Sequence, residues 1–227
     1  MSTFLELCQK VARDSGTVSG TLPSAVTSQS GRLAKVVYWT AEAWRIIQNR
    51  RSAWLWMRAE YEKNLVAGTA RYTASGFALT RWAEWIVEKD TVTIYEASVG
   101  VSDEQPLVFM PWTTYRRTFE RGTQTADRPR YFSVSPAGEL CFGPKPDVIY
   151  TVRGEYRKTV QELAANTDEP EMPARFHDLV AHYGFLLLAE HDEAGLHIEV
   201  AQRRYRELMS DLERDQLPTM SLPDALA

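Results

Sequence analysis

The side chains best suited to chemistry gather in one acidic stretch, residues 168–177. It holds Asp168, Glu169, Glu171 and His177. Carboxylates and imidazoles bind divalent metals, so this set would suit a metal-dependent DNA-processing enzyme. However, Pro170 and Pro173 mark a polar loop, and no apolar neighbours raise a carboxyl pKa for general-acid catalysis. We expect the carboxylates to cap a helix or to lie in a surface loop, and we keep the enzyme as an alternative.

The other histidines form no ligand pattern. His177 and His182 are five residues apart and point to different sides of a helix. Glu190–Glu193 reads Glu-His-Asp-Glu, but consecutive helical residues point about 100° apart. Such a run is typical of a solvated helix end.

The cysteines and the known motifs also give no catalytic site. Cys8 and Cys141 lie far apart without a CxxC spacing, which indicates free thiols. The sequence contains no glycine-rich phosphate loop, no GxSxG and no HExxH. We therefore expect no catalytic residues, no bound metal, no cofactor and no enzymatic activity.

Tryptophan and arginine are concentrated together in the first half of the chain, which holds all seven tryptophans. This mixture is favoured at the centres of protein–protein interfaces, and it can also stack single-stranded nucleic acid. We expect a share of the tryptophans in the core. The candidates for a subunit interface or a nucleic-acid-facing surface are Arg45, Arg50, Arg51, Trp54, Trp56, Arg58, Arg116 and Arg117.

Composition places the chain among soluble globular proteins. It has 227 residues, 44% of them hydrophobic, and a net charge of −4, which excludes wholesale disorder and a disulfide scaffold. Residues 171–227 carry 5 basic and 11 acidic side chains, a net of −6, whereas residues 1–170 carry 21 and 19, a net of +2. The mild acid balance argues against tight, non-specific DNA wrapping, and an acidic surface would let DNA slide past.

No targeting or membrane segment is expected. Residues 1–10 lack a basic region followed by a long apolar run. The longest wholly apolar stretch, Phe185–Ala189, is far shorter than the ~20 residues of a membrane span. We expect a soluble protein made in the cytoplasm.

Apolar spacing predicts helices near both ends of the chain. Residues 3–14 form one helix, and Ser30 is the expected N-cap of a longer helix that runs to Asn49. Pro173 is the expected first residue of a third helix, because its missing N–H costs nothing there. Apolar residues from Ile198 to Leu212 step by three and four, which predicts an antiparallel helical hairpin with the third helix.

The middle of the chain favours strands. The turn at residues 135–138 and the alternation around it predict a hairpin or meander over residues 130–157. A short helix at residues 111–119 interrupts the strands. The expected strands are Arg58–Leu65, Ala70–Ala74, Trp85–Ala97, Arg130–Val134, Glu139–Phe142 and Val148–Tyr156.

The predicted fold is α+β, because no βαβ alternation occurs. Residues 1–57 and 158–216 form a helical bundle, and residues 58–157 form an inserted antiparallel β-rich module. Residues 217–227 are too apolar for a purely solvating tail and are predicted to be a C-terminal docking segment. Its apolar and proline residues are Leu217, Pro218, Met220, Leu222 and Leu226.

The order of several short motifs resembles the head–tail adaptor (connector, head-completion) proteins of tailed bacteriophages over nearly the whole chain. The motifs are Gly31–Trp39, Ala43–Gln48, Trp54–Arg58, Pro111–Arg116, Arg128–Pro136, Gly143–Asp147, Asp168–Pro173 and Phe176–Val180. The specificity lies in their order, since each is a short aromatic or turn pattern.

The resemblance implies a structural virion protein. Such proteins form a ring, usually dodecameric, beneath the portal, where they join capsid to tail and extend the DNA channel. The implied partners are the portal protein, tail or nozzle proteins, other copies of the chain, and encapsidated double-stranded DNA that passes non-specifically through the lumen. No membrane is involved. The implied location is the virion neck, with assembly in the host cytoplasm, and by analogy residues 217–227 reach the portal or a neighbouring subunit. A tail-side component, such as a tail terminator, is the alternative.

Overall fold

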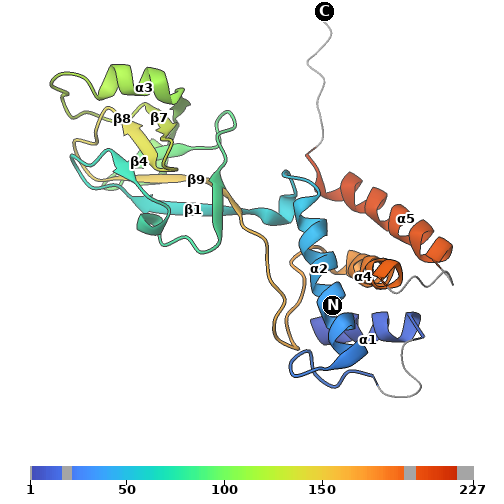
Figure 1. Ribbon diagram of the computed structural model, residues 1–227. Helices are drawn as coiled ribbons and strands as arrows, with labels where there is room; N and C mark the ends of the chain where they lie inside the picture. Colours follow the sequence, from blue (N-terminus) through green and yellow to red (C-terminus); the bar gives the residue numbers. More distant parts are fainter. Residues whose placement is uncertain (1, 17–21, 192–197, 219–227) are drawn as a thin grey trace, which may run out of the picture. The chain divides into compact units, whose positions relative to one another are not determined.

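The computed structural model describes residues 2–16, 22–191 and 198–218 (Figure 1). The chain divides into two compact units. Met1–Met57 and Val160–Ala227 form a helical unit, and Arg58–Thr159 form a β unit. The predicted α+β class is confirmed, with antiparallel-rich sheets inserted between two helical parts of the chain.

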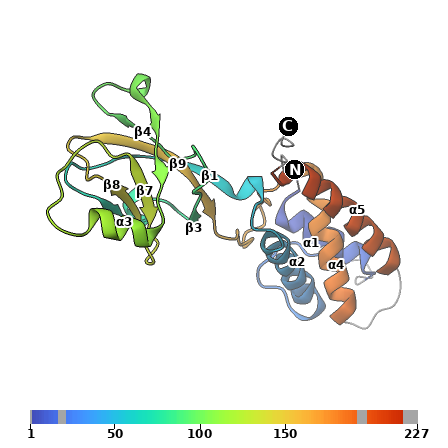
Figure 2. The same ribbon diagram turned by 90° about the horizontal axis from the view of Figure 1, so that it is seen from above.

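The helical unit is built around one central helix. Its helices are α1 (Phe4–Asp14), α2 (Gly31–Asn49), α4 (Asp178–His191) and α5 (Ile198–Gln216). Helix α4 packs against the other three, as Figure 2 shows. It can do so because it buries residues on most of its sides, from Leu179 to Ala189.

A glycine permits the close approach of α2 and α4. A Cβ atom on Gly184 would lie 3.2 Å from the Cα atom of Thr40 and 3.4 Å from a methyl of Val11. The first neighbour is backbone and cannot rotate away. A hydrogen at position 184 is therefore what lets the two helices pack at this distance.

The helix starts agree only in part with the sequence patterns. At α1, Thr3 and Glu6 form a reciprocal capping box. Ser30 stands at the N-cap position of α2, but its side chain makes no capping hydrogen bond. Pro173 does not begin α4. It precedes a 3-10 turn, Ala174–Phe176, whose i to i+3 bonds delay the α-helix until Asp178.

The β unit contains two sheets. Sheet A follows the order β1–β9–β4–β5, with β3 also paired to β9, and sheet B follows β2–β8–β7–β6. The strands of sheet A are β1 (Arg58–Asn64), β3 (Trp82–Trp85), β4 (Thr93–Glu96), β5 (Gln105–Pro106) and β9 (Tyr150–Lys158). Those of sheet B are β2 (Arg71–Tyr72), β6 (Val108–Phe109), β7 (Tyr131–Val134) and β8 (Leu140–Gly143).

The two sheets face each other across one core. Residues of sheet A, such as Tyr61 and Val152, belong to the same buried cluster as Phe132 and Phe142 of sheet B. Because side chains alternate along a strand, the neighbours of these residues lie on the two outer faces. Sheet A therefore presents Glu60 and its outward neighbours to solvent on the side away from sheet B.

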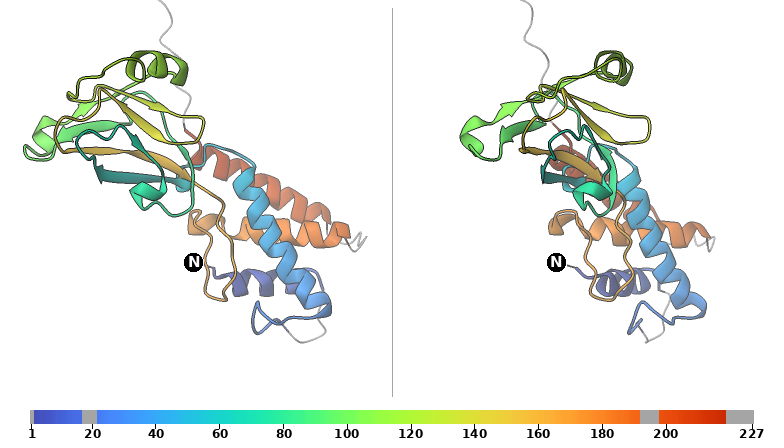
Figure 3. Two further views of the ribbon diagram at one scale, coloured as in Figure 1. Left: turned by 60° about the vertical axis from the view of Figure 1, so that its left-hand side comes forward. Right: turned by 90° about the vertical axis from the view of Figure 1, so that its left-hand side faces the viewer.

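Helix α3 (Trp112–Phe119) covers the outer face of sheet B. Phe119 contacts the ring of Tyr131, which alternates with the core residue Phe132 and so points outward. The Tyr115 hydroxyl donates to the carbonyl of Phe142 at 2.9 Å. Figure 3 shows α3 and β1 on opposite sides of the β unit.

Two strand predictions needed correction. The expected strand over residues 85–97 is interrupted: it contains only the last residue of β3, Trp85, and the four residues of β4, because Glu88–Thr91 form a turn in which Asp90 has a positive φ of 61°. Residues 130–157 are not one meander. β7 and β8 form the predicted hairpin, whose turn is closed by a hydrogen bond from the N–H of Gly138 to the carbonyl of Ser135. In contrast, β9 belongs to sheet A, where it pairs with β1. Pro144 and Pro146 separate β8 from β9, since proline offers no N–H to a ladder.

Candidate functional site

Trp54 is a core residue, and its predicted place on an interaction surface is wrong. It is fully buried, its ring stacks on Trp56 at 4.4 Å between centroids, and its Nε1–H donates to the carbonyl of Ile47 at 3.1 Å. That carbonyl lies in the last turn of α2, where it also accepts from the N–H of the C-cap residue Arg50 at 3.3 Å. Trp56 is half-buried against the same core. The aromatic cluster therefore closes the C-terminal end of α2.

The arginines of α2 and the residues after it are paired within the helical unit. Arg45 binds Glu42 one turn earlier on the same helix. Arg50 and Arg51 both lie near Glu213 of α5, with nitrogen–oxygen distances of 3.9 and 3.0 Å. All three guanidinium groups remain solvent-exposed. Carboxylates of the same chain thus largely neutralise the positive charge of these three arginines.

Arg116 and Arg117 of α3 differ, because the described part of the chain offers them no acidic partner. Together with Arg121, just after the helix, they form what we call the basic α3 face. All three are exposed, and none makes an ion pair with any residue that the structure describes. The nearby Glu120 forms its ion pair with Arg71 instead. The basic α3 face therefore carries three positive charges that no described carboxylate neutralises.

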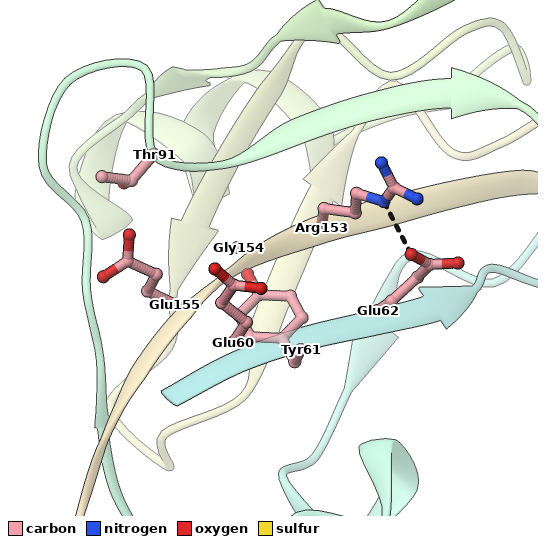
Figure 4. Close-up of a pocket in the computed structure, with 7 residues that line it drawn as sticks. All are labelled: Glu60, Tyr61, Glu62, Thr91, Arg153, Gly154 and Glu155. Carbon is pink, nitrogen blue, oxygen red and sulfur yellow. Dashed lines mark hydrogen bonds and ion pairs between the residues drawn. The ribbon is translucent and has the colours of Figure 1, made fainter. Parts of the chain in front are cut away.

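The opposite side of the β unit carries excess negative charge. An open hollow of about 580 Å³ lies on β1 and β9, lined by Glu60, Glu62, Arg153 and Glu155 among others (Figure 4). Arg153 turns toward Glu62, with Nε 2.6 Å from the carboxylate. Glu60 and Glu155 stand directly opposite each other across the two strands. Like charges in that position repel.

The whole outer surface of sheet A shares this excess. Arg58 pairs with Glu88 and Glu155, and the remaining arginines pair with Glu62, Glu104 and Glu84. Six carboxylates face three guanidiniums, a net charge of −3. We call this surface the acidic sheet face: Glu60, Glu62, Glu84, Glu88, Glu104 and Glu155, with Arg58, Arg153 and Arg157.

One end of the β unit is apolar. The backbone bonds from Leu65 to Tyr150 and from Ala97 to Ile149 bring three loops together there. Five exposed apolar side chains, each between 41% and 61% exposed, gather on these loops: Val66, Val99, Val101, Val148 and Ile149. An exposed apolar cluster of this kind is typical of a protein-docking surface.

The acidic stretch at residues 168–177 serves the fold. The Asp168 carboxylate accepts from the N–H groups of Ala164 and Ala165, both at 2.7 Å, and these bonds lower its pKa. His177 is buried, and its ring nitrogens contact backbone atoms of Ser2 and Met172 at 3.1 Å. Asp168 thus stabilises its own loop, whereas His177 joins the start of the chain to Met172.

Within the described ranges, no group of three or more histidine, cysteine, aspartate or glutamate side chains is arranged to hold a metal ion. The free thiols of Cys8 and Cys141 are buried, which raises their pKa to about 12 and about 11. Thiols in that state are poor nucleophiles. Nor does any helix in the described part of the chain have the length and apolarity to cross a membrane.

The predicted docking segment is described only at its start. Leu217 is half-buried against the helical core and its N–H donates to the carbonyl of Glu213, so it extends α5. Pro218 is exposed. Met220, Leu222 and Leu226 lie outside the described residues, and their role stays a prediction.

A comparison with protein-family models decides the family. The model described as the SU10 adaptor protein matches residues 2–225. The chain belongs to the SU10 adaptor protein family. This membership confirms the resemblance to phage head–tail adaptors, and the protein is a structural adaptor of phage particles that interacts with other virion proteins. A search of curated proteins gave no match.

The SU10 adaptor family suggests a non-enzymatic protein, in keeping with the separate structural tasks of Asp168 and His177. Sequence reasoning missed two surfaces of this adaptor. The acidic sheet face has a local signal, the alternating Glu60 and Glu62, but only the register with Glu155 shows the excess charge. The apolar end has no local signal, because its valines come from three distant loops.

Proposed function

We propose that the chain forms a dodecameric ring beneath the portal, where it joins the capsid to the tail and extends the DNA channel. The observation that supports this function is the family match, which spans residues 2–225 and so includes both units. Double-stranded DNA passes through the lumen without sequence-specific contacts. Assembly takes place in the host cytoplasm.

The surfaces of the β unit suit such a role. A ring subunit needs two different faces for head-to-tail contacts with its neighbours, and further faces for the proteins above and below. The β unit offers a basic face, an acidic face and an apolar end. We propose that the apolar end binds another virion protein, either the portal protein or a tail or nozzle protein.

Residues 217–227 are proposed to dock on the portal or on a neighbouring subunit. Because Leu217 packs against its own helical core, the part able to reach another chain begins after Pro218. A truncation after Pro218 is therefore expected to leave the described fold intact. It is expected to unfold like the full chain and to bind purified portal protein at least about tenfold more weakly.

The direct test is the composition of purified particles. Particles of the phage that encodes the chain are expected to contain it in a fixed ratio to the portal protein, measured by quantitative mass spectrometry. A gold label on its C-terminus is expected at the capsid vertex. Absence from mature particles would contradict the function, and a label at the distal end of the tail would favour a tail-side component.

A further inference from the structure

We infer that the basic α3 face of one copy docks on the acidic sheet face of a second copy, so that the β units form a charge-paired, head-to-tail contact. This inference rests on the proposed ring and assigns the surfaces that build it. It is carried by the distribution of charge over the β unit alone.

The two faces lie on opposite sides of the same unit. Helix α3 covers the outer side of sheet B, where Phe119 packs on Tyr131. The carboxylates of Glu60 and Glu62 point from the outer side of sheet A, since Tyr61 between them lies in the core. A heterologous contact repeated around a ring joins two different surfaces on opposite sides of each subunit, and these faces meet that condition.

The charges on the two faces are complementary in number and in availability. On the basic α3 face, Arg116, Arg117 and Arg121 make no ion pair with any described residue, and the acidic sheet face has a surplus of three carboxylates. Glu60 makes no ion pair with any described residue. It also faces Glu155 directly, so an incoming cation would relieve an existing repulsion.

Arginine is well suited to this contact. Its guanidinium group stays charged and can bind a carboxylate through two parallel hydrogen bonds. Double-stranded DNA is the competing partner for the same arginines, because they would also bind phosphates. A second copy is favoured because it accounts for both faces, whereas DNA would leave the surplus carboxylates of sheet A without a counterpart.

The test is a pair of charge reversals. The sheet variant carries Glu60→Lys and Glu62→Lys, which changes its acidic face from −3 to +1. The helix variant carries Arg116→Glu and Arg117→Glu, which changes its basic face from +3 to −1. All four side chains are exposed. The control is Arg203→Glu with Arg206→Glu on α5, which makes the same charge change on exposed residues of the helical unit.

Each variant is supplied from a plasmid to cells infected with phage that lacks the gene, and copies per purified particle are counted by mass spectrometry. Either reversal alone is expected to lower incorporation by at least about tenfold, because like charges then meet at every contact. Supplied together, the two variants are expected to restore incorporation, since they can alternate around a ring with every contact attractive. The α5 control is expected to behave like the wild type. The charge-preserving Arg116→Lys with Arg117→Lys is expected to be incorporated far better than the helix variant, because it keeps the charge and loses only the paired hydrogen bonds.

Incorporation of either single reversal at the wild-type level would overturn the inference. So would failure of the mixture when both variants unfold at the wild-type temperature. If the helix variant is incorporated normally but its particles lose packaged DNA, the basic face binds DNA and the inference is wrong. These outcomes leave the proposed function standing, which fails only if the wild-type chain itself is absent from particles.

Discussion

Replacing Trp54 separates a core role for the aromatic cluster from an interface role. The side chain is fully buried and donates one hydrogen bond, from Nε1 to the carbonyl of Ile47. Trp54→Phe keeps an aromatic ring but removes this donor and part of the ring volume. The Ile47 carbonyl keeps its bond from the N–H of Arg50, so loss of the indole hydrogen bond costs about 1 kcal/mol, and the smaller ring adds about 1 kcal/mol from lost contacts.

The expected loss is therefore about 2 kcal/mol in the free energy of unfolding. Trp54→Ala removes the whole ring and is expected to cost about 3–5 kcal/mol. The assay is urea unfolding of the isolated protein, followed by helical circular dichroism, because this signal reports the helical unit that contains Trp54. Arg117→Ala, on an exposed surface of α3, is the control and is expected to change stability by less than about 0.5 kcal/mol.

An interface role for Trp54 predicts the opposite pattern. The isolated chain would then unfold like the wild type, and only assembly into particles would suffer. A Trp54→Phe protein whose midpoint and slope match the wild type would therefore refute the assignment of this residue to the core.

Three further predictions follow from buried or bonded groups. Asp168→Asn is expected to cost about 1 kcal/mol at pH 7, because the carboxylate accepts two backbone N–H bonds. These bonds lower the pKa of Asp168, so the stabilisation is present above the usual aspartate pKa and is lost as the pH falls toward the pKa in the folded protein. In urea unfolding, the difference in unfolding free energy between wild type and mutant should therefore shrink at acid pH. An equal difference at all pH values would contradict this. Gly184→Val is expected to cost about 1–3 kcal/mol by thermal unfolding, because its side chain would meet the Thr40 backbone, and an unchanged melting temperature would show that α2 and α4 can separate freely. Cys8 and Cys141 are expected to react with a thiol reagent at pH 8 only after denaturation, and rapid labelling of the native protein would contradict their burial.

The helices were predictable because each has a local signal. The spacing of Phe4, Leu7 and Val11 gives the buried stripe of α1, and the same reasoning identified α2, α4 and α5. The break between β3 and β4 was missed, because the turn depends on the left-handed backbone of Asp90 within a run that otherwise favours strand. The partner of β9 was also missed, since strand pairing is non-local.

The surfaces show a similar division. A tryptophan beside arginines fits a core and an interface equally well in sequence. Only the fold shows that Trp54 closes α2, while Arg116 makes no ion pair with a described residue. Net charge per segment did not identify the acidic sheet face, because its carboxylates come from several strands and loops. Their effect arises from register, which sets Glu60 against Glu155.

Cryo-electron microscopy of purified particles tests the central claim most directly. The claim predicts a closed ring of this chain between the portal and the tail, continuous with the DNA channel and with both units of every copy in the ring. A neck whose density contains no copy of the chain would contradict the account.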